Sequence, residues 1–528
     1  MSKESSSKHF IREFNTSGIC SPQKHYYVSR SQDIQKALIG IEKNKYFTMF
    51  ASRQMGKTTF VDELVGMLDK DIYCPVVISF ETMIDFEEVE FYKYFTKELE
   101  LKGSIKDIPV FTKAVDFKDF VQELQGKLKK KFILIIDEFD GLNKGYLGKL
   151  LHVFREIYFH RGEKFNLHSL ILIGVRNITD VNMDNASPFN TNDELPLPLF
   201  TKEQVFDLMH QYEEETGQPF APEVKEAVYS NTKGQPGLSN ALCKFLVEDY
   251  NPGGTTEIGM GSFDEMLNFF IHGHISKNVA NIINKVKQYK EQVVRVFDTQ
   301  KKIEFNIDTD WIGYLYINGA IDCEVVKVDG RMSTYVKFAN PIYQKKIYNC
   351  FKPDLGGESA RYFEPDEPLG KYYRDEKKEL DLFEIVKNYQ RYVNRRGSQA
   401  FRHAQKRVDG TRVEAAYHYS LDAYLNSAVF SLGGSTHVEF PTGNGKTDIF
   451  VQYKDQRCVV EIKNYQNPAQ IEQAKEQVAT YAQTEGLSEA YLVIFTEVHP
   501  RDKLGVHAEE TINTITVRSV LVNVNFEK

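Results

Sequence analysis

Two stretches of the sequence spell Gly-Lys-Thr, and either could bind a phosphate group. The first lies in SRQMGKTTF, at residues 56–58, and the second in TGNGKTDIF, at residues 445–447. A phosphate-binding loop needs a buried strand before it, backbone N–H groups that curl round the phosphates, and a helix directly after it. The first stretch meets all three needs, because YFTMF is typical of a strand and TTFVDELVGMLDK of a helix. We therefore expect Lys57 to bind the β- and γ-phosphates and Thr58 to ligate Mg²⁺.

The rest of this loop is expected to surround the nucleotide with its backbone. The other residues that we assign to nucleotide binding here are Arg53, Gln54, Met55, Gly56 and Thr59. Ala51 stands where such loops usually begin with glycine. This residue removes some backbone freedom but leaves a side chain small enough for the turn, so the assignment stands.

An acidic motif about 80 residues further on predicts hydrolysis. FILIIDEFD places an apolar run before Asp137 and Glu138, the pattern of a buried strand that ends in acids. Such a strand can deliver one carboxylate to Mg²⁺, here Asp137, and a second to the attacking water, here Glu138. A core strand that ends in a solvated acidic pair has the same pattern. The order of strand, loop, helix and acidic strand favours a site that binds and hydrolyses ATP.

The second Gly-Lys-Thr is predicted to be a turn. Phe440 occupies the position of the first loop glycine, and DIFVQY after Thr447 alternates as a strand does. Without a following helix, a phosphate would lack the amides and the positive helix end that hold it.

The strands around this turn carry a different chemistry. Asp448 opens DIFVQY, and the neighbouring strand RCVVEIKNY contains Glu461 and Lys463, which share one face while Ile462 points into the core. Two carboxylates and an amine can converge there, bind Mg²⁺ and direct water at a phosphodiester. An exposed hairpin with a surface ion pair is the alternative. The apolar residues before Glu461 favour a buried site, because a buried acid and lysine must pair or bind metal.

A helix is expected after these strands. Asn467 is a suitable cap, Pro468 fits the first turn, and Gln473, Gln477 and Tyr481 follow at spacings of four on one stripe.

The surrounding elements predict an α/β multidomain protein. Short strand-like runs (YFTMF, CPVVISF, FILIID, SLILIGV) alternate with helical stretches, as in a parallel sheet with crossover helices. Further along the chain, helical stretches are followed by the strand-like runs WIGYLYINGAI, CEVVKV and STYVKF. This order resembles a winged helix. The predicted domains are an ATPase core at 1–200, a helical lid at 201–270, a winged helix at 271–351, a linker at 352–380 and a C-terminal α/β domain at 381–528.

Composition points to a cytoplasmic protein without a membrane anchor. The six cysteines are scattered, as for reduced thiols, and no apolar run approaches the roughly 20 residues of a membrane helix. A net charge of −8 argues against wholesale coating of nucleic acid but allows a local basic groove. Residues 387–412 carry eight Lys or Arg against one acid, with Tyr389, Tyr392 and Phe401 among them. Such a stretch could bind phosphates and stack on bases, or could be a solvated helix face.

The first 350 residues resemble the AAA-like ATPases of the STAND-type group. The resemblance rests on HYYVSRSQDI, SRQMGKTTF, LPLPLFTKEQV, GQPGLSNAL and VKFANPIYQKKI, in that order. It implies that Tyr27, Val28 and Arg30 lie near the adenine or a domain edge. It also implies that Arg176 is a sensor at a strand end and that Pro236 approaches the base.

Residues 380–520 resemble the PD-(D/E)XK nuclease superfamily, which has a restriction-endonuclease-like fold. The resemblance rests on the Asp448, Glu461 and Lys463 pattern and on the Q-x-x-x-Y spacing of Gln477 and Tyr481. It implies that Asp448 and Glu461 ligate the metal, Mg²⁺ or Mn²⁺, and that Lys463 is catalytic. Gln477 and Tyr481 would then support the site, and Glu414 would match the acid of an upstream helix.

Together these patterns predict an ATP-regulated, metal-dependent nuclease that cuts nucleic acid, with DNA as the expected substrate. By analogy alone, such an architecture suits antiviral defence or genome maintenance. The alternative is a regulatory ATPase switch whose C-terminal domain binds nucleic acid or protein without cutting. A homo-oligomer and a separate activating partner are both compatible with the sequence.

Overall fold

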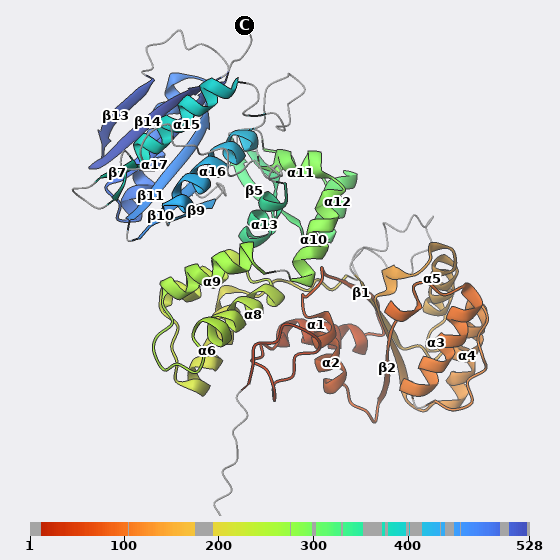
Figure 1. Cartoon of the computed structure of the whole chain (residues 1–528). Helices are drawn as coiled ribbons and strands as arrows, with labels where there is room; N and C mark the ends of the chain where they lie inside the picture. Colours follow the sequence, from red (N-terminus) through yellow and green to blue (C-terminus); the bar gives the residue numbers. More distant parts are fainter. Residues whose placement is uncertain are drawn as a thin grey trace, which may run out of the picture. The chain divides into compact units, whose positions relative to one another are not determined.

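The computed structural model describes most of the chain in two compact units, which Figure 1 colours by sequence. The described residues are 12–103, 105–174, 194–274, 276–297, 302–328, 331–351, 372–374, 379–397, 401, 414–432, 434–438, 448–454, 456–496 and 506–524. The first unit comprises residues up to Ile282 with Gly313–Ile321 and Ala339–Ile342, and the second comprises Ile283–Ile312, Asp322–Phe338 and the chain from Tyr343 onward.

A parallel sheet forms the core of the first unit. Its strands are β1 (Tyr46–Phe50), β2 (Tyr73–Ser79), β3 (Lys131–Asp137) and β4 (Ser169–Gly174), in the order β1-β4-β3-β2. Beyond β1, Glu194 bridges Thr48 in parallel and the N–H of Leu195 donates to the Thr48 carbonyl at 2.8 Å. The four strands coincide with the four apolar runs of the sequence. The predicted α/β fold with a parallel sheet is confirmed.

Alternate residues of each strand face opposite layers of helices. Leu134 and Ile136 pack with α3 (Glu88–Gly103), α4 (Ala114–Lys127) and α5 (Lys144–Phe159). Ile133 and Ile135 pack with α1 (Ser31–Glu42) and α2 (Lys57–Met67). Figure 1 shows the two layers on either side of β1 and β2. Because both faces are covered, these strands are apolar throughout instead of alternating.

A group of helices follows the sheet. They are α6 (Lys202–Thr216), α7 (Pro222–Thr232), α8 (Pro236–Phe245) and α9 (Met260–His272), with a π-helical turn at Leu246–Tyr250 and shorter 3₁₀ turns at Glu81–Met83 and Phe139–Gly141 earlier in the chain. Thr201 and Gln204 form a reciprocal cap at the start of α6, and Gly217 ends it with a φ of +75°. The stretch predicted as a helical lid is thus helical.

The stretch predicted as a winged helix contains helices and one hairpin. Its elements are α10 (Lys277–Lys287), α11 (Lys290–Val296), α12 (Asp310–Ile317), β5 (Ile321–Val328), β6 (Arg331–Phe338) and α13 (Pro341–Phe351). One expectation is corrected, because WIGYLYI belongs to α12 and not to a strand. A short apolar run suits both conformations, and here Gly319, with a φ of +74°, follows the end of a helix. The two compact units divide this stretch between them.

A mixed six-stranded sheet forms the C-terminal domain. Its strands are β9 (Ser435–Val438), β10 (Ile449–Tyr453), β11 (Gln456–Asn464), β12 (Glu489–Thr496), β13 (His507–Ile512) and β14 (Ile515–Asn523), in the order β13-β14-β12-β11-β10-β9. The central pairs β11–β12 and β12–β14 are parallel, and the outer pairs are antiparallel. The domain also contains α15 (Leu382–Arg396), α16 (Glu414–Ser431) and α17 (Pro468–Thr484).

The two faces of this sheet are covered by different helices. Val460 and Ile462 pack into a core with α15 and α16, whereas Val459 packs against α17. Two short strands, β7 (Tyr373–Arg374) and β8 (Glu379–Leu380), pair with each other. Tyr372, just before β7, and Leu380 of β8 are buried in the same core as Ile462. The linker predicted for 352–380 therefore extends too far, because its last residues belong to this domain. Its other residues lie outside the described part of the chain.

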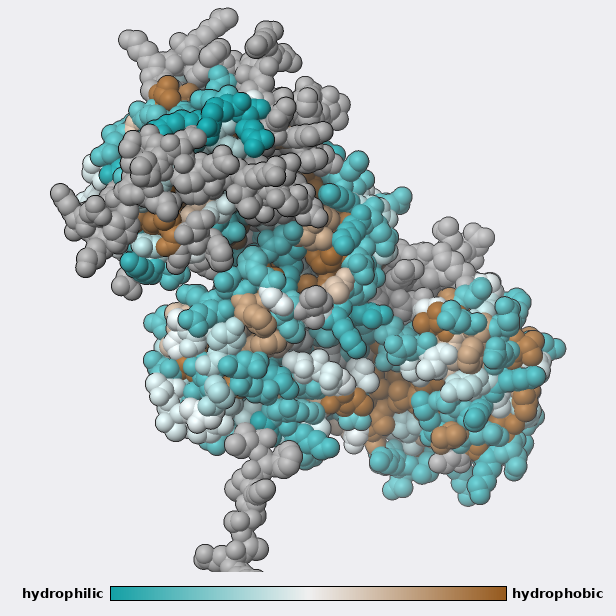
Figure 2. Space-filling view, in the orientation of Figure 1, coloured by the Kyte–Doolittle hydropathy of each residue, from teal (hydrophilic) through white to brown (hydrophobic). Residues whose placement is uncertain are grey.

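Figure 2 shows the hydropathy of one face of the molecule. In Figure 2, hydrophobic side chains are interspersed with hydrophilic ones on the visible face of the first unit. Such scattered apolar residues are usual on folded proteins.

Candidate functional sites

The first Gly-Lys-Thr lies where the sequence places it, between β1 and the start of α2. Gln54 and Gly56 have positive φ angles of +58° and +83°, which curl the loop before the helix begins at Lys57. The Lys57 side chain is buried, and its Nζ donates to the carbonyls of Ala51 at 2.8 Å and Ser52 at 3.3 Å. The loop thus wraps around its own lysine. The first N–H groups of α2 have no acceptors within the helix, so they are available to an anion.

Distant segments hold the carbonyl groups of the loop. The Met55 carbonyl accepts from Arg30 Nη2 at 3.1 Å, and the Arg53 carbonyl accepts from Gln235 Nε2 at 3.3 Å. The Gln54 carbonyl accepts from the N–H of Gly237 at 3.2 Å. Three successive carbonyls are therefore fixed by donors outside the loop, which restricts the orientation of the peptide groups that carry the N–H donors.

Arg30 connects this loop to a second segment. Its Nη1 donates to the Pro198 carbonyl at 2.6 Å, and its guanidinium lies 5.0 Å from the ring centre of Phe200. Burial lowers the pKa of Arg30 to about 10, which still leaves the group charged at neutral pH. The sequence placed Arg30 near the adenine or a domain edge, which stays a prediction. Its contacts make it a brace between the loop and residues 198–200.

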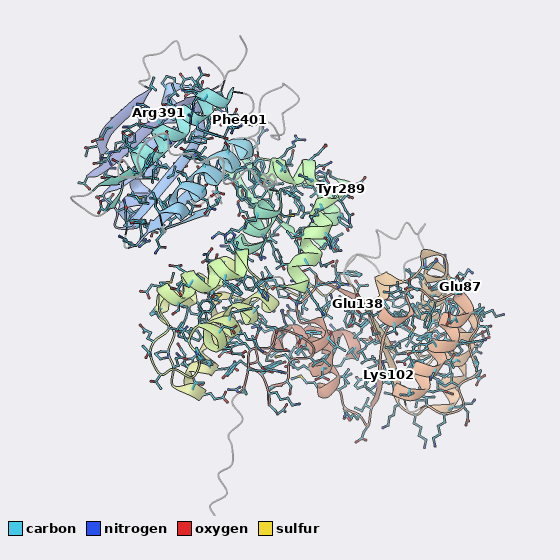
Figure 3. All side chains as sticks on the ribbon, in the orientation of Figure 1. Glu87, Lys102, Glu138, Tyr289, Arg391 and Phe401 are labelled. Atoms are coloured by element: carbon cyan, nitrogen blue, oxygen red, sulfur yellow. The ribbon has the colours of Figure 1, made fainter. Side chains whose placement is uncertain are left out.

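The acidic pair lies at the end of β3. Asp137 is the last residue of that strand, and Glu138, labelled in Figure 3, follows with a φ of +53°. The N–H of Glu138 donates to Asp137 Oδ1 at 2.9 Å. In a parallel sheet, the carboxyl ends of β1 and β3 lie at the same edge, which is where such sheets bind ligands. Arg176, predicted as a sensor after β4, lies outside the described residues.

A cavity of about 690 Å³ opens beside the loop. Its lining includes Gln54, Met55, Gly56 and Thr59 among the predicted residues, and also Tyr27, Val28, Arg30 and Pro236. A volume of this size suits a nucleotide-sized ligand, since small-molecule pockets span about 300–1,000 Å³. The lining brings the start of α8 next to the phosphate-binding loop. The sequence pointed to Pro236 but missed its neighbours Gln235 and Gly237, for which the only signal was a glycine on each side of Gln-Pro.

Gly234 is expected to be essential for the packing of α8 against the rest of the first unit. A Cβ there would lie 1.9 Å from the Phe200 carbonyl oxygen, and its φ is +75°. Gly234→Ala should therefore lower the free energy of unfolding by at least about 3 kcal/mol. Gly217 is the matched control, because it has the same φ of +75° with nothing within 4 Å of its Cβ position. Gly217→Ala should cost only about 1 kcal/mol. Equal losses in urea titrations would contradict the proposed close approach.

The C-terminal acids meet across two neighbouring strands. Ile449 of β10 is paired with Val460 of β11, so in this register Asp448 stands opposite Glu461. Each of these two acids is only 1% exposed. Asp448 Oδ2 accepts from the N–H of Ile462 at 2.5 Å, and Lys463 Nζ donates to Glu461 Oε1 at 2.6 Å. The structure therefore brings Asp448, Glu461 and Lys463 together.

The carboxyl group of Glu461 has a raised pKa although it is paired with Lys463. Burial, followed by the charge of Asp448, raises the pKa of Glu461 to about 8, although Lys463 and His418 act in the opposite direction. Two buried carboxylates so close together are costly when both are ionised. A divalent cation would remove that cost, because it favours the charged form of both.

The donor set fits a hard cation. Asp448 and Glu461 provide carboxylate oxygens, and Mg²⁺ is commonly held by one or two carboxylates while water and substrate phosphates complete its shell. Among the described residues, no group of three or more His, Cys, Asp or Glu side chains is arranged to hold a metal ion. Within the described part of the chain, Asp448 and Glu461 are the two acids that would hold it.

Helix α16 contributes a residue that the sequence analysis missed. Glu414 is the first residue of α16, and the placement of its side chain lies outside the description. His418, one turn later, is buried, and its charge acts on Glu461. The sequence signal for His418 was its position four residues after Glu414, because this spacing places both residues on one stripe of a helix.

Gln477 and Tyr481 are half-buried on α17, whose start matches the prediction. Asn467 caps it by accepting from the N–H of Gln470 at 2.9 Å, and Pro468 is its first residue. Tyr481 packs with Val459, which lies on the same strand as Glu461 and two residues before it. The supporting role of Gln477 and Tyr481 stays a prediction.

The prediction that the basic stretch at 387–412 binds nucleic acid is corrected in part. Tyr389, Tyr392 and Phe401 are buried in the core, so they cannot stack on bases. Arg391 is exposed, and Figure 3 labels it together with Phe401. Helix α15 is thus amphipathic, with aromatic residues inward and arginines outward. Residues 398–400 and 402–412 lie outside the described part, as does the second Gly-Lys-Thr at 445–447.

Two family matches cover separate parts of the chain. Residues 15–249 match the AAA-like domain. The match spans the parallel sheet and helices α6 to α8. Residues 381–498 match a domain of unknown function, DUF8371, which assigns no activity to the C-terminal domain. No curated protein matches the sequence.

Several solved structures are similar to part of this chain at low identity. A Walker-type ATPase of Pyrococcus abyssi is 14% identical, with 63% of this chain and 99% of that chain covered and a TM-score of 0.45. The ORC1 protein of Aeropyrum pernix, solved in complex with DNA, is 13% identical, with coverage of 62% and 93% and a TM-score of 0.32. The RuvB Holliday junction branch migration motor of Thermotoga maritima is 11% identical, with coverage of 58% and 92% and a TM-score of 0.32.

No helix in the described ranges is long and apolar enough to cross a membrane.

Proposed function

We propose that the chain is an ATP-controlled, metal-dependent nuclease. The AAA-like domain would bind and hydrolyse ATP, and the C-terminal domain would cleave nucleic acid, with DNA as the expected substrate. The observation that carries the second half is the buried Asp448–Glu461 pair with Lys463 bonded to it at 2.6 Å. Burying two carboxylates costs free energy, and the binding of a divalent metal would offset that cost.

In the ATPase site, the residues have separate tasks. Lys57 would leave the carbonyls of its own loop and bind the β- and γ-phosphates, while the loop amides hold the remaining oxygens. Thr58 and Asp137 would hold Mg²⁺, and Glu138 would orient the attacking water. Arg176 is proposed as a sensor of the γ-phosphate on the basis of the family resemblance.

In the C-terminal site, Asp448 and Glu461 would hold Mg²⁺ or Mn²⁺. A cation bound there lowers the pKa of water and neutralises charge on the phosphodiester. Lys463 donates to Glu461 Oε1 from a side chain that is 14% exposed, and from there it would contact an incoming phosphate. It would orient the nucleophile or stabilise the developing negative charge. Glu414, Gln477 and Tyr481 are proposed to support this geometry.

A second candidate function is a switch that does not cleave. The ion pair between Lys463 and Glu461 favours it, because the lysine occupies one carboxylate in place of a metal. Such a protein would bind nucleic acid or a protein partner in an ATP-dependent way. A winged helix, a homo-oligomer, an activating partner and a cytoplasmic role in defence or genome maintenance are compatible with either function.

A cleavage assay separates the two functions. Purified full-length protein is incubated with supercoiled DNA, linear DNA and single-stranded RNA, in Mg²⁺, Mn²⁺ or EDTA, with and without ATP. We expect cleavage of DNA that requires the divalent ion and changes with ATP. ATP-dependent binding without cleavage in any combination would support the switch, and cleavage that persists in EDTA would rule out the metal site.

A further inference from the structure

One wall of the cavity is an irregular segment that runs up to the start of α1. This segment, residues 20–30, is called the strap below. The cavity is lined by its residues Cys20, Tyr26, Tyr27, Val28 and Arg30. The phosphate-binding loop lines the same cavity, so a ligand held by the loop lies in a space that the strap bounds. The position of the strap therefore sets the shape of the cavity.

The strap is attached to the helix that begins at the loop. The N–H of Cys20 donates to Thr59 Oγ1 at 3.0 Å. Glu63, one turn further along α2, accepts from the Tyr27 hydroxyl and from Ser29 Oγ, the latter at 2.7 Å. Thr59 and Glu63 also line the cavity. These bonds fix the strap to α2 on one side.

The backbone of the strap is attached to α6 by Gln211. The N–H of Tyr27 donates to Gln211 Oε1 at 3.0 Å, and Gln211 Nε2 donates to the Tyr27 carbonyl at 2.8 Å. One side-chain amide thus pairs with both backbone polar groups of Tyr27. Asp207, one turn earlier on α6, accepts from the same Nε2 at 3.0 Å, and Arg12 Nη1 donates to Oε1 at 3.3 Å. These two contacts identify which end of the amide is the acceptor.

We propose that Gln211 is a positioning residue for the nucleotide, because it holds Tyr27 in the wall of the cavity. This inference rests on the proposed nucleotide binding at Lys57. Gln211 itself is not among the described residues that line the cavity. A strap that separates from α6 loosens this wall, and ordering it again on binding costs free energy that lowers the affinity. Since binding free energies are linked, ATP must in turn strengthen the connection between the strap and α6.

The test compares a ligand that fills the cavity with one that reaches only the loop. Calorimetric titrations of the full-length protein with Mg²⁺ measure the Kd of ATP and of inorganic triphosphate. Gln211→Met keeps the length of the side chain but removes both hydrogen bonds to Tyr27. It should weaken ATP binding about tenfold and leave the affinity for triphosphate within about twofold. A purely structural role would weaken the binding of both ligands alike.

Gln204→Met is the matched control on the same helix. Gln204 Oε1 accepts from the N–H of Thr201 at 2.9 Å, within the cap at the start of α6. This variant should keep the wild-type affinity for ATP. Wild-type ATP affinity in Gln211→Met would overturn the inference. Equal weakening of ATP binding in the two variants, or of ATP and triphosphate binding in Gln211→Met, would do the same.

Hydrogen exchange on the wild-type protein tests the inference even if Gln211→Met does not fold. The N–H of Tyr27 donates to Gln211, so ATP should slow its exchange with solvent. Exchange at Tyr27 that ATP leaves unchanged would overturn the assignment of Gln211. Absence of any nucleotide binding to wild type would contradict the proposed function itself, whereas ATP binding that does not depend on Gln211 would overturn this inference alone.

Discussion

Lys57→Met is expected to weaken ATP binding about 100-fold, which corresponds to roughly 2.7 kcal/mol. The ammonium would supply charge-assisted hydrogen bonds to the phosphates, and methionine keeps the length of the side chain without the charge. In the structure, Lys57 Nζ donates to the carbonyls of Ala51 and Ser52 in its own loop, at 2.8 and 3.3 Å. Calorimetry with ATP and Mg²⁺ measures the change in Kd directly.

A thermal shift gives an independent measure. ATP that binds only the folded state stabilises it by RT ln(1 + [L]/Kd), so the rise in Tm with ATP should disappear in Lys57→Met. Lys36→Met is the matched control, because Lys36 is 62% exposed and pairs with Asp33 on the surface of α1. It should keep both the affinity and the thermal shift. ATP affinity within threefold of wild type in Lys57→Met would contradict the assignment of this loop.

Glu461→Gln is expected to reduce metal-dependent cleavage at least about 100-fold, more than the loss of an outer-shell partner of a metal typically costs. Glutamine keeps the size of the side chain but cannot supply the negative charge that the proposed metal site needs. ATP binding should not change, because the altered residue lies in the C-terminal domain. The measurement is the rate of DNA cleavage at saturating Mg²⁺, together with the Kd of ATP.

The same variant should be more stable than wild type at high pH in EDTA. The pKa of Glu461 is raised from 4.5 to about 8 in the folded protein, so the folded state binds more protons than the unfolded state between these values. The contribution of Glu461 to stability is therefore highest below this window and is lost as the pH rises through it. Glutamine does not titrate. The Tm advantage of Glu461→Gln should thus be larger at pH 8 than at pH 5.

Glu509→Gln provides the control for both measurements. Glu509 is 57% exposed and pairs with Arg518 at 2.9 Å in the same domain. Its replacement should leave cleavage unchanged and alter stability by no more than about 0.5 kcal/mol. Full cleavage activity in Glu461→Gln would eliminate the proposed metal site. A Tm advantage that grows toward low pH would contradict the raised pKa.

Local sequence patterns predicted the first sheet and the elements around the phosphate-binding loop. The four strands of the first sheet, the loop before α2 and the acids at the end of β3 were all predicted, because each depends on apolar runs and on neighbours along the chain. The proximity of Asp448 and Glu461 was likewise predictable. Glu461 belongs to β11 and Asp448 directly precedes β10, the strand paired with it, so the alternation of side chains places both acids on one face.

Tertiary structure alone decided which distant residues serve these sites. Arg30, Gln235 and Gly237 hold the carbonyls of the phosphate-binding loop, and Gln211 holds the strap that lines the cavity beside it. Local spacing does not give these contacts, because they join segments far apart along the chain; Gln235 and Arg53, for example, are 182 residues apart. Likewise, whether an aromatic such as Tyr389 stacks on a base or fills a core depends on what packs against its helix. Burial is a property of the assembled fold, whereas side-chain periodicity is a property of the chain.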